Sequence, residues 1–159
     1  FYFTIPYVPI NRKITREDAS TSSVTSPTRK LKILIAEDEE ISGEYINILV
    51  KNYATEIINV QNGLEAVEVC RKNSDIDLVL MDILMPVMNG YEAIKQIREF
   101  NKDVIIIAQT AYALDGDKEK ALAAGCDDYI KKPINKTELL TKIENCISHR
   151  KKHNYELIN

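Results

Sequence analysis

The sequence predicts a doubly wound α/β domain built around a five-stranded parallel sheet. Short apolar runs alternate along the chain with segments in which apolar residues recur at helical spacing. The first, third and fourth runs are apolar almost without interruption, which is typical of strands covered by helices on both faces. We therefore expect residues 31–150 to form one domain with the strand order 2-1-3-4-5.

Two strand–helix repeats are predicted before residue 74. Residues 32–36 (KILIA) form a short apolar strand, and a segment of helical periodicity follows it. Residues 55–60 (TEIINV) predict the second strand, after which Asn62-Gly63 turns the chain into a helix over 64–73. The first helix is expected to pack through one apolar face. That face comprises Ile41, Tyr45, Ile48 and Leu49.

The third strand is predicted over residues 76–83 (IDLVLMDI), and the fourth over 104–110 (VIIIAQT). Between them, Asn89 is placed to cap a helix over 90–100, because an Asn side chain accepts a hydrogen bond from a free amide of the first turn. An apolar stripe is expected along this helix. It consists of Ile94, Ile97 and Phe100.

The last two helices flank a fifth strand over 128–132 (DYIKK). The helix over 117–125 ends at Gly125, which suits the left-handed position after a helix. Asn135 and Glu138 have capping-box spacing at the start of the helix over 135–152. The residues of this helix expected to be buried are Leu139, Leu140, Ile143 and Ile147. The complete pattern is that of a flavodoxin-like (βα)5 domain.

The composition is that of a water-soluble protein, with 45% hydrophobic and 28% charged residues among 159. A net charge of −3 gives no argument for binding nucleic acid or a membrane surface. The sequence contains no apolar run long enough to span a bilayer and no recognisable signal peptide. Three cysteines without a CxxC motif favour reduced thiols, so we expect a cytoplasmic location and no membrane insertion of this domain.

Polar residues follow the carboxyl ends of four predicted strands, the edge at which open parallel sheets bind ligands. Glu37 and Asp38 follow the first strand, Asp82 ends the third, Thr110 ends the fourth, and Lys132 ends the fifth. With the predicted strand order, these five residues converge on one site. Taken singly, each has an ordinary explanation, such as a solvated helix start for the EDEE run or a surface position for the lysine.

Three carboxylates without His or Cys favour a hard cation, and Mg²⁺ is bound in proteins by one or two carboxylates together with phosphate oxygens. A lysine and a hydroxyl donor beside them complete a set suited to phosphoryl transfer onto a carboxylate. No glycine-rich phosphate loop is present, so the sequence indicates no nucleotide site.

Residues 31–150 resemble the receiver domain of two-component response regulators, through four motifs in order: ILIAEDEE, LVLMDILMPVMNG, IIIAQTAYA and DDYIKKPI. The resemblance implies that Asp82 accepts a phosphoryl group from a phosphohistidine. It implies that Thr110 and Lys132 contact the phosphoryl oxygens, that Tyr129 is a switch residue, and that the Lys132–Pro133 peptide is cis. It also implies a set of Mg²⁺ ligands: Glu37, Asp38, Asp82 and the backbone carbonyl of Leu84.

Two departures from the family pattern bear on the chemistry. Glu37 stands where Asp is commoner, and its longer side chain suggests contact with the metal through water. Leu84 and Tyr112 occupy the two positions that control how water reaches the acyl phosphate in this family. We hypothesise that these apolar or bulky side chains slow spontaneous hydrolysis.

Residues 1–10 (FYFTIPYVPI) resemble the last strand of the ATP-binding domain of sensor histidine kinases, and residues 11–30 have the Ser/Thr-rich composition of a flexible linker. With a short tail over 151–159, this order suggests the C-terminal receiver of a hybrid histidine kinase, itself a phosphoacceptor with at most slow autodephosphorylation. The expected partner is a histidine phosphotransfer domain or the parent kinase core. Docking is expected at the region of the first helix or at the face made by the fourth helix, fifth strand and fifth helix, which is also a possible homodimer face.

Two alternatives remain at this point. One is a phosphatase with an aspartyl nucleophile, which usually carries a second Asp two residues after the first, where this chain has Leu84. The other is a receiver-shaped interaction module that is not phosphorylated. A flavodoxin-like cofactor site fits poorly, because the acidic loop after the first strand would repel a phosphate.

Overall fold

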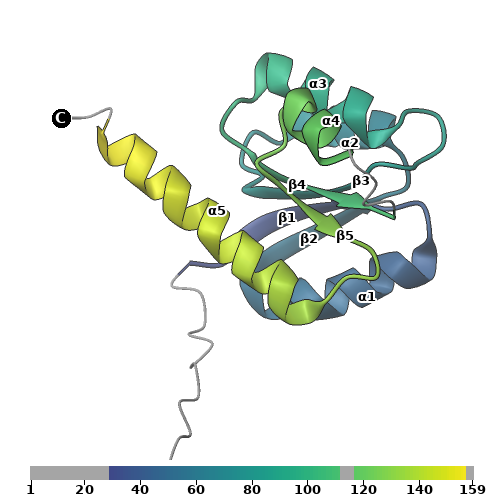
Figure 1. The fold of residues 1–159 in the computed structure, drawn as a ribbon, viewed down its shortest axis with the longest axis horizontal. Helices are drawn as coiled ribbons and strands as arrows, with labels where there is room; N and C mark the ends of the chain where they lie inside the picture. The colour runs from purple at the N-terminus through teal and green to yellow at the C-terminus, as the bar shows by residue number, and fades with distance from the viewer. Residues whose placement is uncertain (1–28, 112–116, 157–159) are drawn as a thin grey trace, which may run out of the picture.

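The computed structural model describes residues 29–111 and 117–156. In this part of the chain, five parallel strands form one sheet in the order β2-β1-β3-β4-β5, which confirms the predicted fold class and strand order (Figure 1). The strands are β1 (Leu31–Ala36), β2 (Ala54–Val60), β3 (Leu78–Asp82), β4 (Ile105–Thr110) and β5 (Asp128–Lys131). The helices are α1 (Glu40–Val50), α2 (Gly63–Lys72), α3 (Gly90–Phe100), α4 (Asp117–Ala124) and α5 (Lys136–Glu156), with a 3-10 turn over Lys51–Tyr53.

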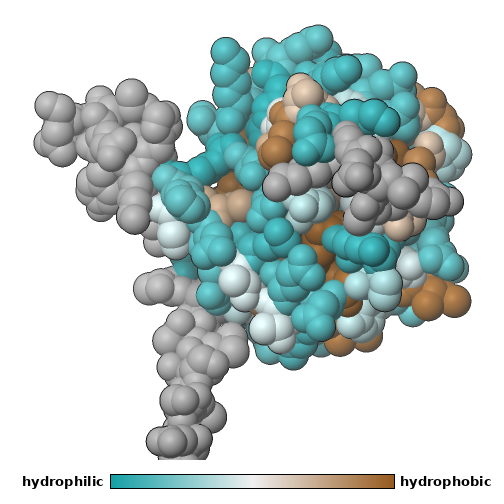
Figure 2. Space-filling view, in the orientation of Figure 1, coloured by the Kyte–Doolittle hydropathy of each residue, from teal (hydrophilic) through white to brown (hydrophobic). Residues whose placement is uncertain are grey.

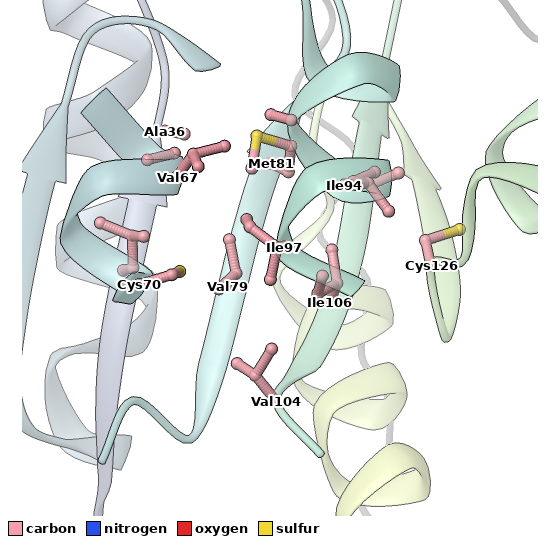
Figure 3. Close-up of a cluster of buried hydrophobic side chains, with 14 of the residues drawn as sticks. Ala36, Val67, Cys70, Val79, Met81, Ile94, Ile97, Val104, Ile106 and Cys126 are labelled. Atoms are coloured by element: carbon pink, nitrogen blue, oxygen red, sulfur yellow. The ribbon is translucent and has the colours of Figure 1, made fainter. Parts of the chain in front are cut away.

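The sheet is covered on both faces because its central strands are apolar on both sides. Helices α2, α3 and α4 lie over one face, and α1 and α5 lie over the other (Figure 1). Alternate residues of β3 and β4 enter the two cores: Val79 and Ile106 face α2 and α3, whereas Leu80 and Ile107 face α1 and α5. Figure 3 shows the first core, where side chains of α2 and α3 point toward those of β3 and β4.

The predicted caps at Asn89 and Asn135 are confirmed, and Asn62, which was predicted only to turn the chain, also caps a helix. The side chains of Asn62, Asn89 and Asn135 each accept a hydrogen bond from the backbone amide three residues later, at 2.9–3.1 Å. Gly125 adopts a φ of 106° after α4, as expected for the residue that ends a helix in the left-handed region. The Lys132–Pro133 peptide is cis.

The predicted buried face of α1 is wrong in three of its four residues. Ile41 and Ile48 are 78% and 72% exposed, and Tyr45 is also exposed. The buried face instead contains Leu49 with Ile46 and Val50. Helical periodicity shows which apolar residues share a face, but α1 has two apolar faces, and only its placement against the sheet selects one.

The helix α3 shows a smaller correction. Ile94 and Ile97 are fully buried, but Phe100 is 41% exposed and packs under the guanidinium of Arg71, 5.0 Å from the ring centroid. Phe100 is the last residue of α3, and its ring is covered by Arg71 of α2 instead of being enclosed in the core.

At the ends of the chain, α5 continues to Glu156, beyond the predicted end of the domain at residue 150. The predicted kinase strand over residues 1–10 and most of the linker lie outside the described residues. The described part begins with Arg29, whose guanidinium pairs with Asp77 at 3.0 Å. None of the described helices is long and apolar enough to cross a membrane.

Candidate functional site

Strand register brings the predicted site residues to one edge of the sheet. Asp82 at the end of β3 pairs with Gln109 of β4, and Thr110 pairs with Lys131 of β5, the residue before Lys132. The amide of Lys132 donates to the carbonyl of Thr110 at 2.8 Å, so β5 reaches the site in register with β4. The carboxyl ends of neighbouring parallel strands lie at the same edge, and this edge is where the site forms.

Lys132 joins two of the acidic residues. Its Nζ donates to Oε2 of Glu37 and to Oδ2 of Asp82, both at 2.6 Å. Glu37 and Asp82 are 6% and 4% exposed, and Thr110 is 7% exposed. The ammonium therefore holds two buried carboxylates side by side; its position beside Asp82 was predicted, and its bond to Glu37 was not.

Asp38 completes an acidic cluster. One carboxylate oxygen from each of Glu37, Asp38 and Asp82 lies within 4.8 Å of the others, and Asp38 is exposed to solvent. Three carboxylates against one ammonium leave two negative charges, and a divalent cation would balance them. Oxygen ligands alone suit Mg²⁺, so the residues present fit the predicted ion.

The pKa shifts of Glu37 and Lys132 reflect the same excess of negative charge. Burial raises the pKa of the Glu37 carboxyl, the hydrogen bond from Lys132 opposes that rise, and the charge of Asp82 adds to it. Burial by itself would lower the pKa of the Lys132 ammonium, but its hydrogen bonds to Asp82 and Glu37 outweigh burial and raise that pKa. Lys132 therefore stays charged, and the cluster favours any further positive charge.

The carboxylate of Asp82 is positioned by the loop that follows β3. Oδ1 of Asp82 accepts a hydrogen bond from the amide of Leu84 at 3.0 Å, and the side chain of Leu84 is 54% exposed. Gly90, at the start of α3, packs directly on the backbone of Asp82, because a Cβ at Gly90 would lie 2.2 Å from the carbonyl oxygen of Asp82. The loop is thereby closed against the strand end, and only a residue without a side chain allows that approach.

The predicted switch residue lies at the edge strand of the same sheet. The ring of Tyr129 is half-buried and packs against the core under α3 and α4. The ammonium of Lys142, from α5 on the other face, lies 5.3 Å from the centroid of this ring and bonds both carboxylate oxygens of Asp128 at 3.0 and 3.1 Å. Tyr112, the second residue expected to affect phosphate lifetime, lies outside the described residues.

Three features of the site region were missed from the sequence. Gly90 was interpreted only as the start of a helix, although its position after the LMPVMN loop could have suggested a close approach. Lys142 lies in a basic, polar helix and carries no signal that it meets Tyr129. Gln109 is a fully buried amide within an apolar strand, and its polarity was the available signal.

The chain was compared with known proteins. The response regulator receiver domain family matches residues 33–144. Hybrid signal transduction histidine kinase G of Dictyostelium discoideum is 45% identical over 120 residues, which cover 70% of this chain and 3% of that protein. Hybrid signal transduction histidine kinase I of the same organism is 41% identical over 112 residues, covering 65% of this chain and 6% of its own length. The chain thus spans a small fraction of these relatives.

Solved structures agree with the fold. One similar chain comes from the co-crystal structure of the Saccharomyces cerevisiae phosphotransfer protein Ypd1 with the receiver domain of Ssk1, at 36% identity and a TM-score of 0.67, covering 72% of this chain and 87% of that one. Another is the receiver domain of the sensor histidine kinase PA1611 of Pseudomonas aeruginosa, with a magnesium ion in its active-site cleft. It is 34% identical with a TM-score of 0.67 and covers 75% of this chain and 98% of its own. From its fold, its acidic site and these matches, the chain belongs to the response regulator receiver domain family of two-component signalling.

Proposed function

We propose that this receiver takes a phosphoryl group from a phosphohistidine onto Asp82 in a Mg²⁺-dependent reaction. A carboxylate oxygen of Asp82 would form the new O–P bond, the N–P bond would break, and the histidine nitrogen would keep the electron pair and take a proton from solvent. The observation that carries the proposal is the buried carboxylate of Asp82, bonded by Lys132 and adjoining two further carboxylates.

The neighbouring residues have complementary roles in this proposal. Glu37, Asp38, Asp82 and the backbone carbonyl of Leu84 would hold Mg²⁺, which supplies neutralisation of the charge on the transferred group. Lys132, whose Nζ lies 2.6 Å from Oδ2 of Asp82, would bind a phosphoryl oxygen. The hydroxyl of Thr110 would bind another oxygen and, by moving toward it, allow Tyr129 to rotate inward.

The phosphodonor partner is proposed to be a histidine phosphotransfer domain or a histidine kinase core. The receiver of Ssk1 was crystallised with such a phosphotransfer protein. On this chain, the exposed apolar residues of α1 offer a docking surface beside the site, because α1 begins directly after the acidic loop. These residues are Ile41, Tyr45 and Ile48. Figure 2 shows hydrophobic side chains at the lower right, where Figure 1 places α1.

The relatives support a wider proposal about the parent protein. Two are hybrid histidine kinases of which this chain matches a small part. We infer that residues 1–10 end a kinase ATP-binding domain, that 11–30 are a linker, and that the receiver acts in the cytoplasm as a phosphoacceptor with at most slow autodephosphorylation. We propose that phosphorylation remodels the face formed by α4, β5 and α5. The same face is the proposed contact surface of a homodimer.

A direct test uses the intact protein with Mg²⁺ and acetyl phosphate, a small phosphodonor. Intact-mass measurement is expected to show one added phosphoryl group, and chelation of Mg²⁺ is expected to abolish the gain. Asp82→Ala should gain nothing, whereas Asp75→Ala, an exposed acid at the opposite edge of the sheet, should behave as the wild type. A gain of mass that persists in Asp82→Ala would overturn the proposal, and so would no gain in the wild type.

The docking surface has its own test. Ile48→Glu is expected to slow phosphoryl transfer from a phosphorylated histidine phosphotransfer domain, because it places a charge in the apolar contact, while leaving the reaction with acetyl phosphate unchanged. Leu122→Glu on α4 is the matched control, since Leu122 is also an exposed apolar side chain. If only Leu122→Glu slowed the transfer, the partner would dock at the face formed by α4, β5 and α5.

A further inference from the structure

Gln109 is a polar residue in an otherwise apolar strand, and its side chain has no exposed surface. Within the described residues, neither its Nε2 nor its Oε1 has a hydrogen-bond partner. Buried polar groups are almost always hydrogen-bonded, because a buried donor or acceptor that has lost water and gained nothing is unfavourable. An amide left in this condition beside a reactive site calls for an explanation.

The position of Gln109 follows from the alternation of β4. Ile105 and Ile107 belong to the core under α1 and α5, so Gln109 stands on the same face of the sheet. On β3, Leu78 and Leu80 belong to that core too, which places Asp82 on the same face as well. That leaves the amide and the phosphoacceptor carboxylate as side-chain neighbours on two adjacent strands.

The register makes this relation specific. Gln109 is the residue directly paired with Asp82 across β3 and β4, and neighbouring strands lie about 4.8 Å apart. The carbonyl of Gln109 also accepts the amide of Ile83, at 3.0 Å, so the backbones of the two strands are joined at this point. A glutamine side chain is long enough to reach across that spacing to a carboxylate.

In the unphosphorylated structure, both carboxylate oxygens of Asp82 already accept a hydrogen bond from another group. Its Oδ1 accepts from the backbone of Leu84 at 3.0 Å, and its Oδ2 accepts from Lys132 at 2.6 Å. Phosphorylation changes this, because one carboxylate oxygen becomes bonded to phosphorus and the lysine is drawn to the phosphoryl oxygens. With the phosphoryl group on Oδ1, the acyl oxygen is Oδ2, which then loses the hydrogen bond from Lys132.

We propose that Gln109 is a positioning residue for the phosphorylated state, in which its side-chain amide donates to the acyl oxygen of phospho-Asp82. The amide is unpaired before phosphorylation and paired after it, so it favours phosphorylation by destabilising the unmodified state and stabilising the modified one. This inference rests on the proposed function at Asp82 and adds a residue that contributes through the neighbouring strand.

The size of the effect follows from the usual net value of one hydrogen bond. Loss of the amide should weaken the binding of a phosphoryl mimic about 2- to 10-fold. Beryllium fluoride with Mg²⁺ is the probe, because it forms a phosphoryl-like group on a carboxylate. Gln109→Met is the variant, since methionine has a similar length and volume without a hydrogen-bonding amide.

Three measurements on the full chain separate this role from simple packing. The urea midpoint of unmodified Gln109→Met is expected to exceed that of the wild type, because an unpaired buried amide is removed. The affinity of Gln109→Met for beryllium fluoride is expected to fall about 2- to 10-fold. In the wild type, the side-chain NH₂ resonances of Gln109 should shift when beryllium fluoride is added.

Asn47→Leu is the matched control, because Oδ1 of Asn47, on α1, is another buried acceptor that has no partner in the described part of the chain. It is expected to leave the affinity for beryllium fluoride unchanged. Equal affinity in Gln109→Met and wild type would overturn the inference, as would a lower urea midpoint in unmodified Gln109→Met, which would mean that the amide already has a partner. A wild type that does not bind beryllium fluoride would instead count against the proposed function.

Discussion

At the scale of single residues, Asp82 is tolerated in a nearly buried position because its charge is shared. Its two oxygens accept from a backbone amide and from Lys132, and an ionised carboxylate with both kinds of donor is far less costly than an isolated one. The same ammonium also bonds Glu37. Removing Lys132 would therefore leave two buried acids without their shared counter-ion.

Leu84 is the residue for which the lifetime of the phosphorylated state is predicted. The amide of Leu84 donates to Asp82 and its side chain is exposed, and we propose that this side chain limits the access of water to a phosphoryl group on Asp82. Leu84→Asn is expected to shorten the half-life of the phosphorylated protein roughly 2- to 10-fold, because an amide can hold an attacking water. The half-life is measured by monitoring the loss of the phosphoryl group over time by intact mass. An unchanged or longer half-life would contradict the hypothesis that Leu84 slows hydrolysis.

At the scale of elements, the start of α3 is held against the end of β3 by a glycine. A Cβ at Gly90 would lie 2.2 Å from the carbonyl oxygen of Asp82 and 2.8 Å from Cα of Ile83. Gly90→Ala should lower the free energy of unfolding by at least about 2 kcal/mol, because backbone atoms must move apart. It should also reduce phosphorylation of Asp82 by displacing the carboxylate, and urea unfolding with intact mass tests both effects.

Gly43 provides the control within the same protein. It lies inside α1, and a Cβ there would meet only Cγ of Glu37, at 3.9 Å. Gly43→Ala is expected to raise the free energy of unfolding by about 0.5–1 kcal/mol, because alanine loses less conformational entropy in a helix. If both glycine variants changed stability alike, close approach at Gly90 would not be the cause.

The contact between α5 and the edge strand predicts an influence on the switch. The ammonium of Lys142 lies 5.3 Å from the ring of Tyr129, and inward rotation of the ring would separate them. Lys142→Met should therefore increase the affinity for beryllium fluoride about 2- to 5-fold, the factor that corresponds to one exposed cation–π contact. Lys131→Met, at an exposed position on β5, is the control. Equal affinity for beryllium fluoride in the wild type and in Lys142→Met would show that Lys142 does not influence the switch.

At the scale of the whole molecule, the two cores on opposite faces of the sheet enclose all three cysteines as free thiols. Cys70 and Cys126 lie in the core under α2, α3 and α4, and Cys146 lies in the core under α5. Burial raises the pKa of each thiol to about 11, since a thiolate is poorly solvated there. Ionisation of these thiols is therefore coupled to the folding equilibrium, because their pKa differs between the folded and the unfolded chain.

This linkage predicts a loss of stability at alkaline pH. A thiol in the unfolded chain ionises near its ordinary pKa of 9.0, but the folded thiols ionise only at about 11. Their contribution is fully present below pH 9 and is lost as the pH rises toward 11, so the urea midpoint should fall over that interval. Replacing the three cysteines by alanine should flatten the fall. At pH 8, a thiol reagent should label the protein only after unfolding.

Much of the fold was predictable because its signals are local. The helix caps at Asn89 and Asn135, the left-handed Gly125 and the apolar β3 and β4 were each identified from a few neighbouring residues. The face of α1 was not, because apolar residues occur on both of its sides. Ile41 and Ile48 lie outside, and only packing against the sheet shows it.

Part of the candidate site was likewise predictable from the sequence, and part was not. The order of acidic, Thr and Lys motifs by itself determined which residues meet, since parallel strands with a fixed order bring their carboxyl ends to one edge. Only the tertiary structure decided that Lys132 bonds both Glu37 and Asp82, and that the side chain of Gln109, the residue paired with Asp82, has no hydrogen-bond partner among the described residues. Side-chain hydrogen bonds between distant residues depend on distances of a few tenths of an ångström, and the order of residues along a chain does not determine these.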